Sequence, residues 1–311
     1  MDRTAAGVQR RRMGKTRFEV YPLCLGGNVF GREGRTDEAA AWEILDRFFE
    51  AGGNCIDTAD IYADGASEEI IGKWMAARHN REDIVIATKV GFHGGLSPEN
   101  IRQALEGSLR RLGVDSIDLY YAHTDDKSVP LVDVVRTFDA LVQEGMVAVL
   151  GASNYSVERL DQALMLARSE GLHEFQVIQP HYNLVHRTEY EGLLADLAVR
   201  EEIAVFPYYG LASGFLTGKY RKGATVESTR AGTAWKYLDS RGERILAALD
   251  RVAEEQHATV AQVALAWLAA MPGITAPIAS ARTLGQLEEL LPMADLVLSQ
   301  EEMALLSAAS S

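Results

Sequence analysis

The stretch NCIDTADIYADGASEEIIG, residues 54–72, contains the pattern that decides the fold. An apolar run ends on the carboxylate of Asp57, the aromatic hydroxyl of Tyr62 follows in a loop, and a Ser-Glu-Glu sequence then leads into a helix. A short strand, a polar loop and a helix in this order form one repeat of an α/β sheet. A carboxylate at the end of a buried strand therefore directs attention to the other strand ends.

The same alternation of strand and helix runs along the whole chain. Eight short β-rich runs predict strands at residues 20–25, 53–57, 84–89, 117–122, 146–150, 175–179, 203–207 and 274–278. Longer helical patterns predict helices at about 38–51, 67–79, 98–112, 131–144, 156–169, 188–200, 241–256, 260–270 and 283–291. Thr259 followed by Gln262 fits a capping box.

Strand–helix alternation with right-handed crossovers implies a parallel sheet. Eight strands without a composition break or a linker favour one closed (β/α)8 TIM barrel over two domains, with residues 1–311 as a single domain. The segment RRMGKTRFEV, residues 11–20, predicts an N-terminal β-hairpin that plugs one end, with Gly14-Lys15 in its turn. Extra C-terminal helices complete the expected α/β architecture.

The composition limits the partners of the protein. The 311 residues are 47 % hydrophobic, which is enough for a sizeable core, and the formal net charge is −13. An acidic surface disfavours nucleic acid and anionic membranes as partners. No apolar stretch reaches the ~18 residues of a membrane span, and no signal-peptide pattern opens the chain. The Arg10–Arg12 run could be a targeting signal, but a solvated basic patch before the first strand is the favoured interpretation.

The two cysteines, Cys24 and Cys55, lie in apolar, strand-like runs. Two cysteines make no disulfide framework, and no metal-ligand spacing surrounds them. We expect two buried free thiols in a reducing cytoplasm, and no metal site.

The residues at the predicted strand ends are strongly polar. Taken singly, each has an ordinary structural explanation: Asp57 could cap the next helix, and His123 could be a core histidine. Together at the mouth of one barrel, where barrel enzymes keep their active sites, they indicate a site. The residues are Asp57, Lys89, His123, Ser153, Asn154 and Gln179, with Tyr208 following the seventh strand.

Three of these side chains, together with Tyr62 in the loop after Asp57, suit proton delivery to a carbonyl oxygen. The hydroxyl of Tyr62 has an ordinary pKa of about 10, and a neighbouring Lys89 ammonium is expected to lower that pKa. A carboxylate at Asp57 would keep the lysine charged and oriented, and His123 could donate a hydrogen bond to the carbonyl from the other side. The group is a plausible proton donor to a developing alkoxide.

The chain resembles the aldo-keto reductase superfamily over nearly its whole length. The segments that carry the resemblance occur in the family's order. They are DTADIYADGASEEIIG, IATKVG, IDLYYAH, VLGASNYS, QPHYNL, YGLASGFLTGKY, AQVALAWL and PIASARTLGQLEEL. The resemblance implies a barrel that binds a nicotinamide cofactor without a Rossmann domain, with a catalytic tetrad at Asp57, Tyr62, Lys89 and His123.

The resemblance also implies the cofactor contacts. Ser153, Asn154 and Gln179 would hold the nicotinamide carboxamide, and Tyr208 would stack on the ring. The loop with Leu211, Ser213, Gly214 and Lys219 would cover the pyrophosphate. Ser280 and Arg282 would hold the adenosine 2′-phosphate of NADP, and Gln286 and Glu289 match adenine-side positions. Leu290 departs from the family pattern by removing an amide that can contact adenine.

The leading interpretation is an NADPH-dependent reductase of aldehydes and ketones, in which Tyr62 protonates the oxygen. A second is a cofactor-binding regulatory or auxiliary protein with little turnover. A third, a Schiff-base lyase using Lys89, is disfavoured because a charged lysine beside Asp57 is a poor nucleophile. The partner would be a small carbonyl compound, and the protein a monomer or small homo-oligomer. Substrate choice would depend on the 28–35 loop with Phe30, the 209–240 loop, Phe92, Tyr155 and Trp235.

Overall fold

The N-terminal hairpin has the predicted place and turn. The computed structural model describes residues 7–32, 36–226 and 231–311. Strands β1 (Arg11–Arg12) and β2 (Glu19–Val20) pair antiparallel, with the turn at Gly14-Lys15 between them. Met13 is fully buried and packs with the side chains that fill the barrel interior, so the hairpin closes that end of the sheet.

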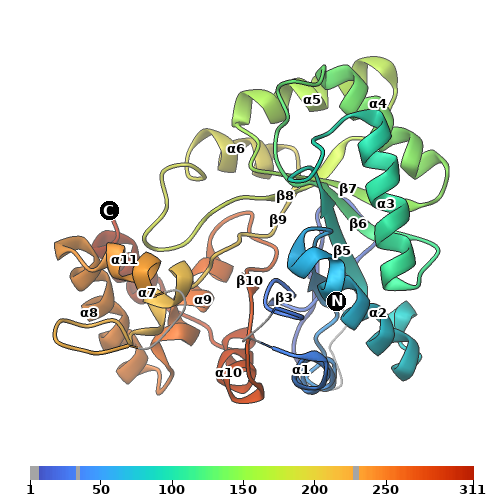
Figure 1. Ribbon diagram of the computed structural model, residues 1–311. Coiled ribbons are helices and arrows are strands. Elements are labelled where there is room, and N and C mark those ends of the chain that lie inside the picture. Colours follow the sequence, from blue (N-terminus) through green and yellow to red (C-terminus); the bar gives the residue numbers. More distant parts are fainter. Residues whose placement is uncertain (1–6, 33–35, 227–230) are drawn as a thin grey trace.

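Eight parallel strands form the central sheet, in the order β10-β3-β4-β5-β6-β7-β8-β9 (Figure 1). Hydrogen bonds join its two edges: Thr275 N–H donates to Val205 O, and Ile278 N–H donates to Pro207 O, each at 2.9 Å. The predicted α/β barrel is therefore confirmed. The strands are β3 (Cys24–Gly26), β4 (Cys55–Asp57), β5 (Val85–Val90), β6 (Ile117–Ala122), β7 (Val147–Ser153), β8 (Phe175–Gln179), β9 (Ala204–Val205) and β10 (Ile278–Ala279).

Prolines account for two of the strands whose limits were predicted wrongly. The run predicted at 20–25 divides at Pro22, so that Val20 ends the hairpin and β3 starts at Cys24. The run predicted at 274–278 gives only an isolated bridge at Ile274 before β10 begins at Ile278. Pro22 and Pro277 carry no N–H to donate to a neighbouring strand.

Helices surround the strands (Figure 1). Helix α9 has its predicted limits and the predicted capping box of Thr259 and Gln262. Helix α6 begins at Leu193, later than predicted, because the chain from Pro180 to Gly192 is irregular. The helices are α1 (Glu38–Glu50), α2 (Ala66–Arg78), α3 (Pro98–Leu112), α4 (Leu131–Gln143), α5 (Val157–Glu170), α6 (Leu193–Arg200), α7 (Ala231–Ala234), α8 (Ser240–Glu255), α9 (Val260–Ala270), α10 (Leu284–Leu290) and α11 (Gln300–Ala309).

The C-terminal helix α11 packs beside α8, outside the strand–helix repeat (Figure 1). Arg187 and Arg241 fix its end by donating to the Ser310 hydroxyl and the Ser310 carbonyl, respectively. Helix α11 is one of the extra C-terminal helices that the sequence predicted. Residues 227–230 of the long 209–240 loop and residues 33–35 of the 28–35 loop lie outside the described residues.

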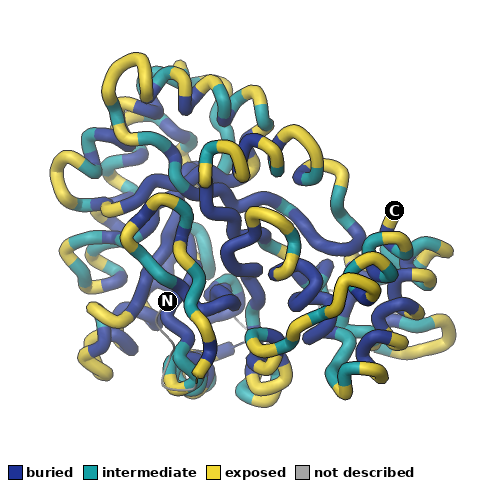
Figure 2. Tube along the Cα trace, turned by 180° about the vertical axis from the view of Figure 1, so that it is seen from behind, coloured by how far each residue is buried: buried dark blue, intermediate teal, exposed yellow. Residues whose placement is uncertain are grey.

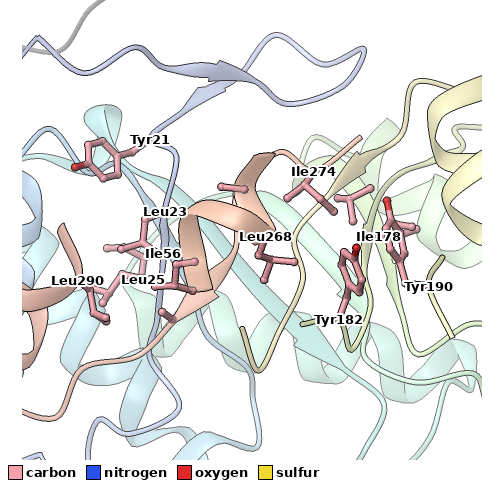
Figure 3. Close-up of a cluster of buried hydrophobic side chains, with 14 of the residues drawn as sticks. Tyr21, Leu23, Leu25, Ile56, Ile178, Tyr182, Tyr190, Leu268, Ile274 and Leu290 are labelled. Carbon is pink, nitrogen blue, oxygen red and sulfur yellow. The ribbon is translucent and has the colours of Figure 1, made fainter. Parts of the chain in front are cut away.

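Two apolar layers make the core. One fills the barrel interior and includes both free cysteines, which are buried as predicted. The other lies between the sheet and the helices, and Figure 2 shows the buried central strands with exposed segments around them. Figure 3 shows Leu290 in this second layer near Leu25 and Ile56, and it is 6 % exposed. Leu290 therefore serves as a core residue here.

Arg11 corrects the predicted solvated patch. It lies in β1, and its guanidinium donates to the Ala269 carbonyl at 2.7 Å and the Thr275 carbonyl at 3.3 Å. Arg11 thus ties the hairpin to the end of α9 and to the segment before β10. Among the described residues, no helix has the length and apolar character needed to cross a membrane.

Candidate active site

The ends of neighbouring strands bring the predicted carboxylate, ammonium and imidazole together. Asp57 is the last residue of β4, Lys89 lies near the end of β5, and His123 directly follows β6. These three strands are neighbours in the parallel sheet, so their carboxyl ends open at one mouth. Tyr62 comes from the short 3₁₀ turn that follows β4.

Lys89 is the centre of the group. Its Nζ donates to Asp57 Oδ2 and to the Thr58 carbonyl, each at 2.6 Å, and the lysine side chain is fully buried. Burial disfavours the ammonium, but the charge of Asp57 and the nearby Tyr62 outweigh it, so the pKa of Lys89 lies above its ordinary value. The lysine is therefore a fixed positive charge at neutral pH.

Tyr62 is held within hydrogen-bond reach of this ammonium. The Lys89 Nζ lies 3.4 Å from the Tyr62 hydroxyl and 4.9 Å from the centre of its ring. Burial nevertheless raises the pKa of Tyr62 above its ordinary value, although Lys89 acts in the opposite direction. The expected net lowering of this pKa is wrong for this structure, because the loss of hydration exceeds the effect of the lysine. Tyr62 is a protonated phenol at neutral pH.

His123 faces the same tyrosine. The two rings meet edge to face with centres 6.0 Å apart, and Phe92 meets His123 in the same way at 4.4 Å. Burial and the charge of Lys89 lower the pKa of His123 to about 2. The imidazole is therefore neutral at physiological pH. Its Nδ1 is buried and has no hydrogen-bond partner among the described residues.

A second polar cluster lies beside the first. Ser153 Oγ donates to the Gln179 carbonyl at 2.8 Å, and Asn154 Nδ2 donates to the His123 carbonyl at 2.9 Å. Gln179 Nε2 donates to Asp57 Oδ1 at 2.8 Å, which joins the two clusters. The Tyr208 hydroxyl donates to Asn154 Oδ1 at 2.8 Å. The structure therefore brings together the residues that the resemblance assigned to a carboxamide.

The loop after β9 supplies the next predicted positions. Leu211 precedes a short 3₁₀ segment (Ala212–Thr217), in which Ser213 and Gly214 have left-handed φ values of 58° and 94°. Lys219 follows; it is exposed, and its Nζ lies 5.4 Å from the centre of the Tyr220 ring. Its ammonium forms no ion pair with a described residue. The loop therefore places an exposed cation close to a tightly curved backbone.

The end of β10 contains the remaining predicted positions. Ser280 Oγ donates to Asn28 Oδ1 at 2.8 Å, and the Gln286 side chain accepts from the Arg282 N–H at 2.9 Å. The Arg282 guanidinium itself has no hydrogen bond or ion pair with the described part of the chain. The Glu289 side chain is exposed, while its carbonyl accepts from Gln262 Nε2 at 2.6 Å.

These residues fit a nicotinamide dinucleotide. Lys219 and Arg282, two cations without an ion-pair partner among the described residues, follow the last two strands of the barrel, where barrel folds commonly bind phosphate. Amide and hydroxyl groups at the ends of β7 and β8 can exchange their present partners for a carboxamide. The aromatic face of Tyr208 lies beside them, stacked on His181 with ring centres 5.2 Å apart.

Other residues named from the sequence have different places. Phe30 is fully buried and Tyr155 is 7 % exposed, whereas Trp235 packs against Tyr220. Phe92 is 53 % exposed beside His123. Sequence reasoning missed Tyr209, which is 47 % exposed and meets the Tyr208 ring edge to face. Its position next to Tyr208 after a strand end was the available signal.

A cavity of about 490 Å³ lies next to this mouth. It shares Asn154 and Gln179 with the polar cluster but is lined by none of Asp57, Tyr62, Lys89 and His123. Its walls come from the start of α5 and the irregular segment before α6. The described residues contain no cluster of metal-binding side chains, and His181 instead stacks on His186 with ring centres 3.7 Å apart.

Comparisons with known proteins agree with this architecture. The chain is 34 % identical to an uncharacterised oxidoreductase of Bacillus subtilis, over 95 % of this chain and 94 % of that protein. It is 31 % identical to the aryl-alcohol dehydrogenase [NADP(+)] of Phanerodontia chrysosporium, over 93 % of this chain and 82 % of that protein. It is 33 % identical to a probable voltage-gated potassium channel subunit beta of Arabidopsis thaliana, over 93 % of this chain and 92 % of that protein.

The sequence model of the Aldo/keto reductase family matches residues 22–311, which include every strand of the barrel and the whole mouth. The match starts after the N-terminal hairpin and extends through α11. With its eight-stranded barrel and its group of Asp57, Lys89, Tyr62 and His123, the chain belongs to the aldo/keto reductase family.

Proposed function

We propose that the protein reduces small aldehydes or ketones with NADPH, and that Tyr62 delivers the proton. Family membership makes the protein an oxidoreductase of carbonyl chemistry. The observation that supports Tyr62 as the proton donor is the series of contacts from Asp57 through Lys89 to Tyr62 at the barrel mouth. When bound, a reduced nicotinamide supplies the hydride.

The proton side of the reaction follows from the three side chains. As negative charge grows on a carbonyl oxygen, the Tyr62 phenol can donate its proton, and the Lys89 ammonium stabilises the phenolate that remains. Asp57 keeps the lysine charged and directed at the phenol. Neutral His123 has one ring N–H, which can donate to the same oxygen.

The choice of NADPH over NADH rests on Arg282. Its guanidinium has no partner in the described chain, and the protein carries a net charge of −13. An added 2′-phosphate would meet a strongly acidic molecule unless a local cation received it. A guanidinium can form a forked, charge-assisted contact with such a phosphate, with Ser280 as a neighbouring hydroxyl.

The rim of the mouth favours an apolar substrate. Phe92 and Tyr209 are both exposed aromatic side chains, and each contacts a residue of the proposed site. Aromatic faces of this kind gain from covering an apolar or aromatic group. We therefore propose carbonyl compounds with an aromatic or aliphatic body, in preference to sugars. The protein would act as one domain over 1–311 and as a cytoplasmic monomer or small homo-oligomer.

A second candidate is a cofactor-binding auxiliary protein with little turnover. The observation that favours it is the similarity to a protein named as a probable voltage-gated potassium channel subunit beta. Both candidates require the cofactor contacts described above, so binding alone does not separate them. A lyase that forms a Schiff base on Lys89 is disfavoured, because Asp57 and Tyr62 hold that lysine as an ammonium.

The deciding experiment measures two rates on one protein preparation. Turnover with NADPH is measured over a panel of aromatic aldehydes, aliphatic aldehydes, ketones and aldoses, and NADPH release is measured by stopped-flow fluorescence. Reduction of aromatic aldehydes with multiple turnovers supports the enzyme. NADPH binding without turnover on any member of the panel supports the auxiliary protein instead.

A further inference from the structure

The turn that presents Tyr62 is conformationally strained. After Tyr62, the residues Ala63, Asp64 and Gly65 have φ values of 50°, 53° and 94°. Non-glycine residues adopt such left-handed conformations only where the surroundings hold them. The feature that holds this turn therefore also sets the position of the Tyr62 hydroxyl.

Arg111 of α3 lies directly beneath the turn. A Cβ atom placed on Gly65 would lie 2.6 Å from Arg111 Cδ and 2.7 Å from its Nε. A Cβ on Gly107, one helical turn earlier, would lie 2.9 Å from the guanidinium. Two glycines thus leave the space that this arginine occupies, one on the turn and one on its own helix.

Arg111 is fixed by a buried acid. Its Nε donates to Glu68 Oε2 at 2.7 Å, and the Glu68 side chain is fully buried. The other oxygen, Glu68 Oε1, accepts from Thr88 Oγ1 at 2.5 Å. Thr88 directly precedes Lys89 on β5, and the Lys89 carbonyl accepts from the Asp60 N–H at 3.3 Å. Strand β5, helix α2, helix α3 and the turn are therefore joined around one site.

We propose that Arg111, held by Glu68, is a positioning residue that sets the distance between the Tyr62 hydroxyl and the Lys89 ammonium. The proposal rests on the proposed function. The Thr88–Glu68–Arg111 connection starts next to Lys89 and ends under the turn that bears Tyr62. The Lys89 ammonium and the Tyr62 hydroxyl are thus both positioned by segments that contact the same buried pair of Glu68 and Arg111.

A fixed frame matters because proton transfer is sensitive to small displacements. A misplacement of about 1 Å can lower a rate by about 100-fold. The present separation of 3.4 Å between Lys89 Nζ and the Tyr62 hydroxyl is already at the outer limit of a hydrogen bond. Relaxation of the turn away from its left-handed conformation would change this separation.

The test compares Arg111→Ala with Arg111→Lys and Arg110→Ala. Arg110 is the neighbouring arginine on α3, is exposed, and has no hydrogen bond or ion pair with a described residue, so it is the matched control. We expect Arg111→Ala to lower kcat for an aldehyde by about 10- to 100-fold and to leave NADPH affinity unchanged. Arg111→Lys should restore part of kcat, and Arg110→Ala should retain wild-type kcat.

A spectroscopic readout separates this proposal from the proposed function. The protein is labelled with 3-fluorotyrosine, and the ¹⁹F resonance of residue 62 is assigned by its loss in Tyr62→Phe. In Arg111→Ala this resonance and its titration should shift, whether or not the wild type turns over. If wild type reduces no carbonyl compound, the proposed function fails while the ¹⁹F comparison still decides the position of Tyr62.

Two results would overturn the proposal. One is an Arg111→Ala protein, folded by circular dichroism, with wild-type kcat and an unchanged ¹⁹F resonance. Arg111→Ala leaves Glu68 buried without its cation, which can prevent folding. If Arg111→Ala does not fold, Arg111→Lys is the deciding variant. A kcat several-fold below wild type then supports the proposal. The second result that would overturn it is an Arg111→Lys protein with wild-type kcat and an unchanged ¹⁹F resonance.

Discussion

The Nζ atom of Lys89 lies 2.6 Å from Oδ2 of Asp57, and the two charges are buried together at the end of neighbouring strands. A buried pair of this kind is held in place by its further hydrogen bonds. Lys89 also donates to the Thr58 carbonyl, and Asp57 also accepts from Gln179. The ion pair is therefore held rigidly, and the position of the Tyr62 phenol relative to the Lys89 ammonium depends on it.

Lys89→Met is expected to lower the rate of carbonyl reduction and to move the alkaline limb of its pH profile. Lys89 opposes the effect of burial on Tyr62, so its removal raises the pKa of the phenol further. The phenol then stays protonated to higher pH but is a weaker acid. Turnover with saturating NADPH is measured up to the highest pH at which the wild type stays folded, so that the limb of a phenol whose pKa is raised falls within the range. An unchanged profile would mean that Lys89 does not tune Tyr62.

Tyr62→Phe is expected to retain NADPH binding and to lose most carbonyl reduction, by about 10²- to 10⁴-fold. The substitution removes the hydroxyl that lies 3.4 Å from the Lys89 ammonium and keeps the ring that meets His123. Single-turnover kinetics with a slowly reduced aldehyde measure the chemical step directly. Near-normal rates in this variant would contradict the assignment of the proton donor.

Asp60 makes the stability of the protein depend on pH. Burial, together with Glu68, raises the pKa of Asp60 to about 6, while Arg111 and His93 act in the opposite direction. The ordinary pKa of aspartate in an unfolded chain is about 3.9. Between these values the folded protein binds the proton and the unfolded chain does not, so stability falls as the pH rises from about 4 to about 6.

Asp60→Asn is therefore expected to stabilise the protein at pH 7.5, on the order of 1–2 kcal/mol, and to have little effect at pH 4. Its carboxylate has one buried oxygen without a partner among the described residues, which is consistent with a penalty for the charged form. Urea denaturation at the two pH values measures the difference. Asp64→Asn, an exposed carboxylate in the same turn, is the control. Equal effects at both pH values would contradict the prediction.

The barrel and the group around Lys89 were predictable because they depend on local sequence. Apolar runs that end on Asp57, Lys89 and His123 fix both the strands and the edge at which their polar ends meet. The direction of the pKa shift of Tyr62 was not predictable, because it depends on how deeply the packed turn buries the ring.

Other details depend on partners that are distant in the sequence. From the sequence, Leu290 was interpreted as the loss of an adenine contact. In the structure it packs in the layer between the sheet and the helices. The Tyr208–Asn154 hydrogen bond joins residues 54 positions apart, and the Glu68–Arg111 pair joins residues 43 positions apart. No spacing rule along the chain connects such pairs.

The preference for NADPH depends on Arg282 in our proposal. The guanidinium follows β10 and has no partner in the described chain, whereas its backbone is fixed by Gln286 and Thr36. NADPH differs from NADH by a 2′-phosphate, which an unpaired arginine can receive and an acidic protein otherwise repels. Arg282→Ala should therefore weaken NADPH binding by about 1.5–3 kcal/mol, the scale of a hydrogen bond to a charged group, and leave NADH binding nearly unchanged.

Titration of both cofactors by fluorescence quenching, into wild type and variant, measures the two affinities. Arg110→Ala again serves as the control, because it removes the same charge from an exposed site on α3 and should weaken NADPH binding little. Added salt should reduce the wild-type preference for NADPH and should have less effect on Arg282→Ala, since the lost contact is between charges. Equal losses for both cofactors, or a wild type that prefers NADH, would place the phosphate away from Arg282.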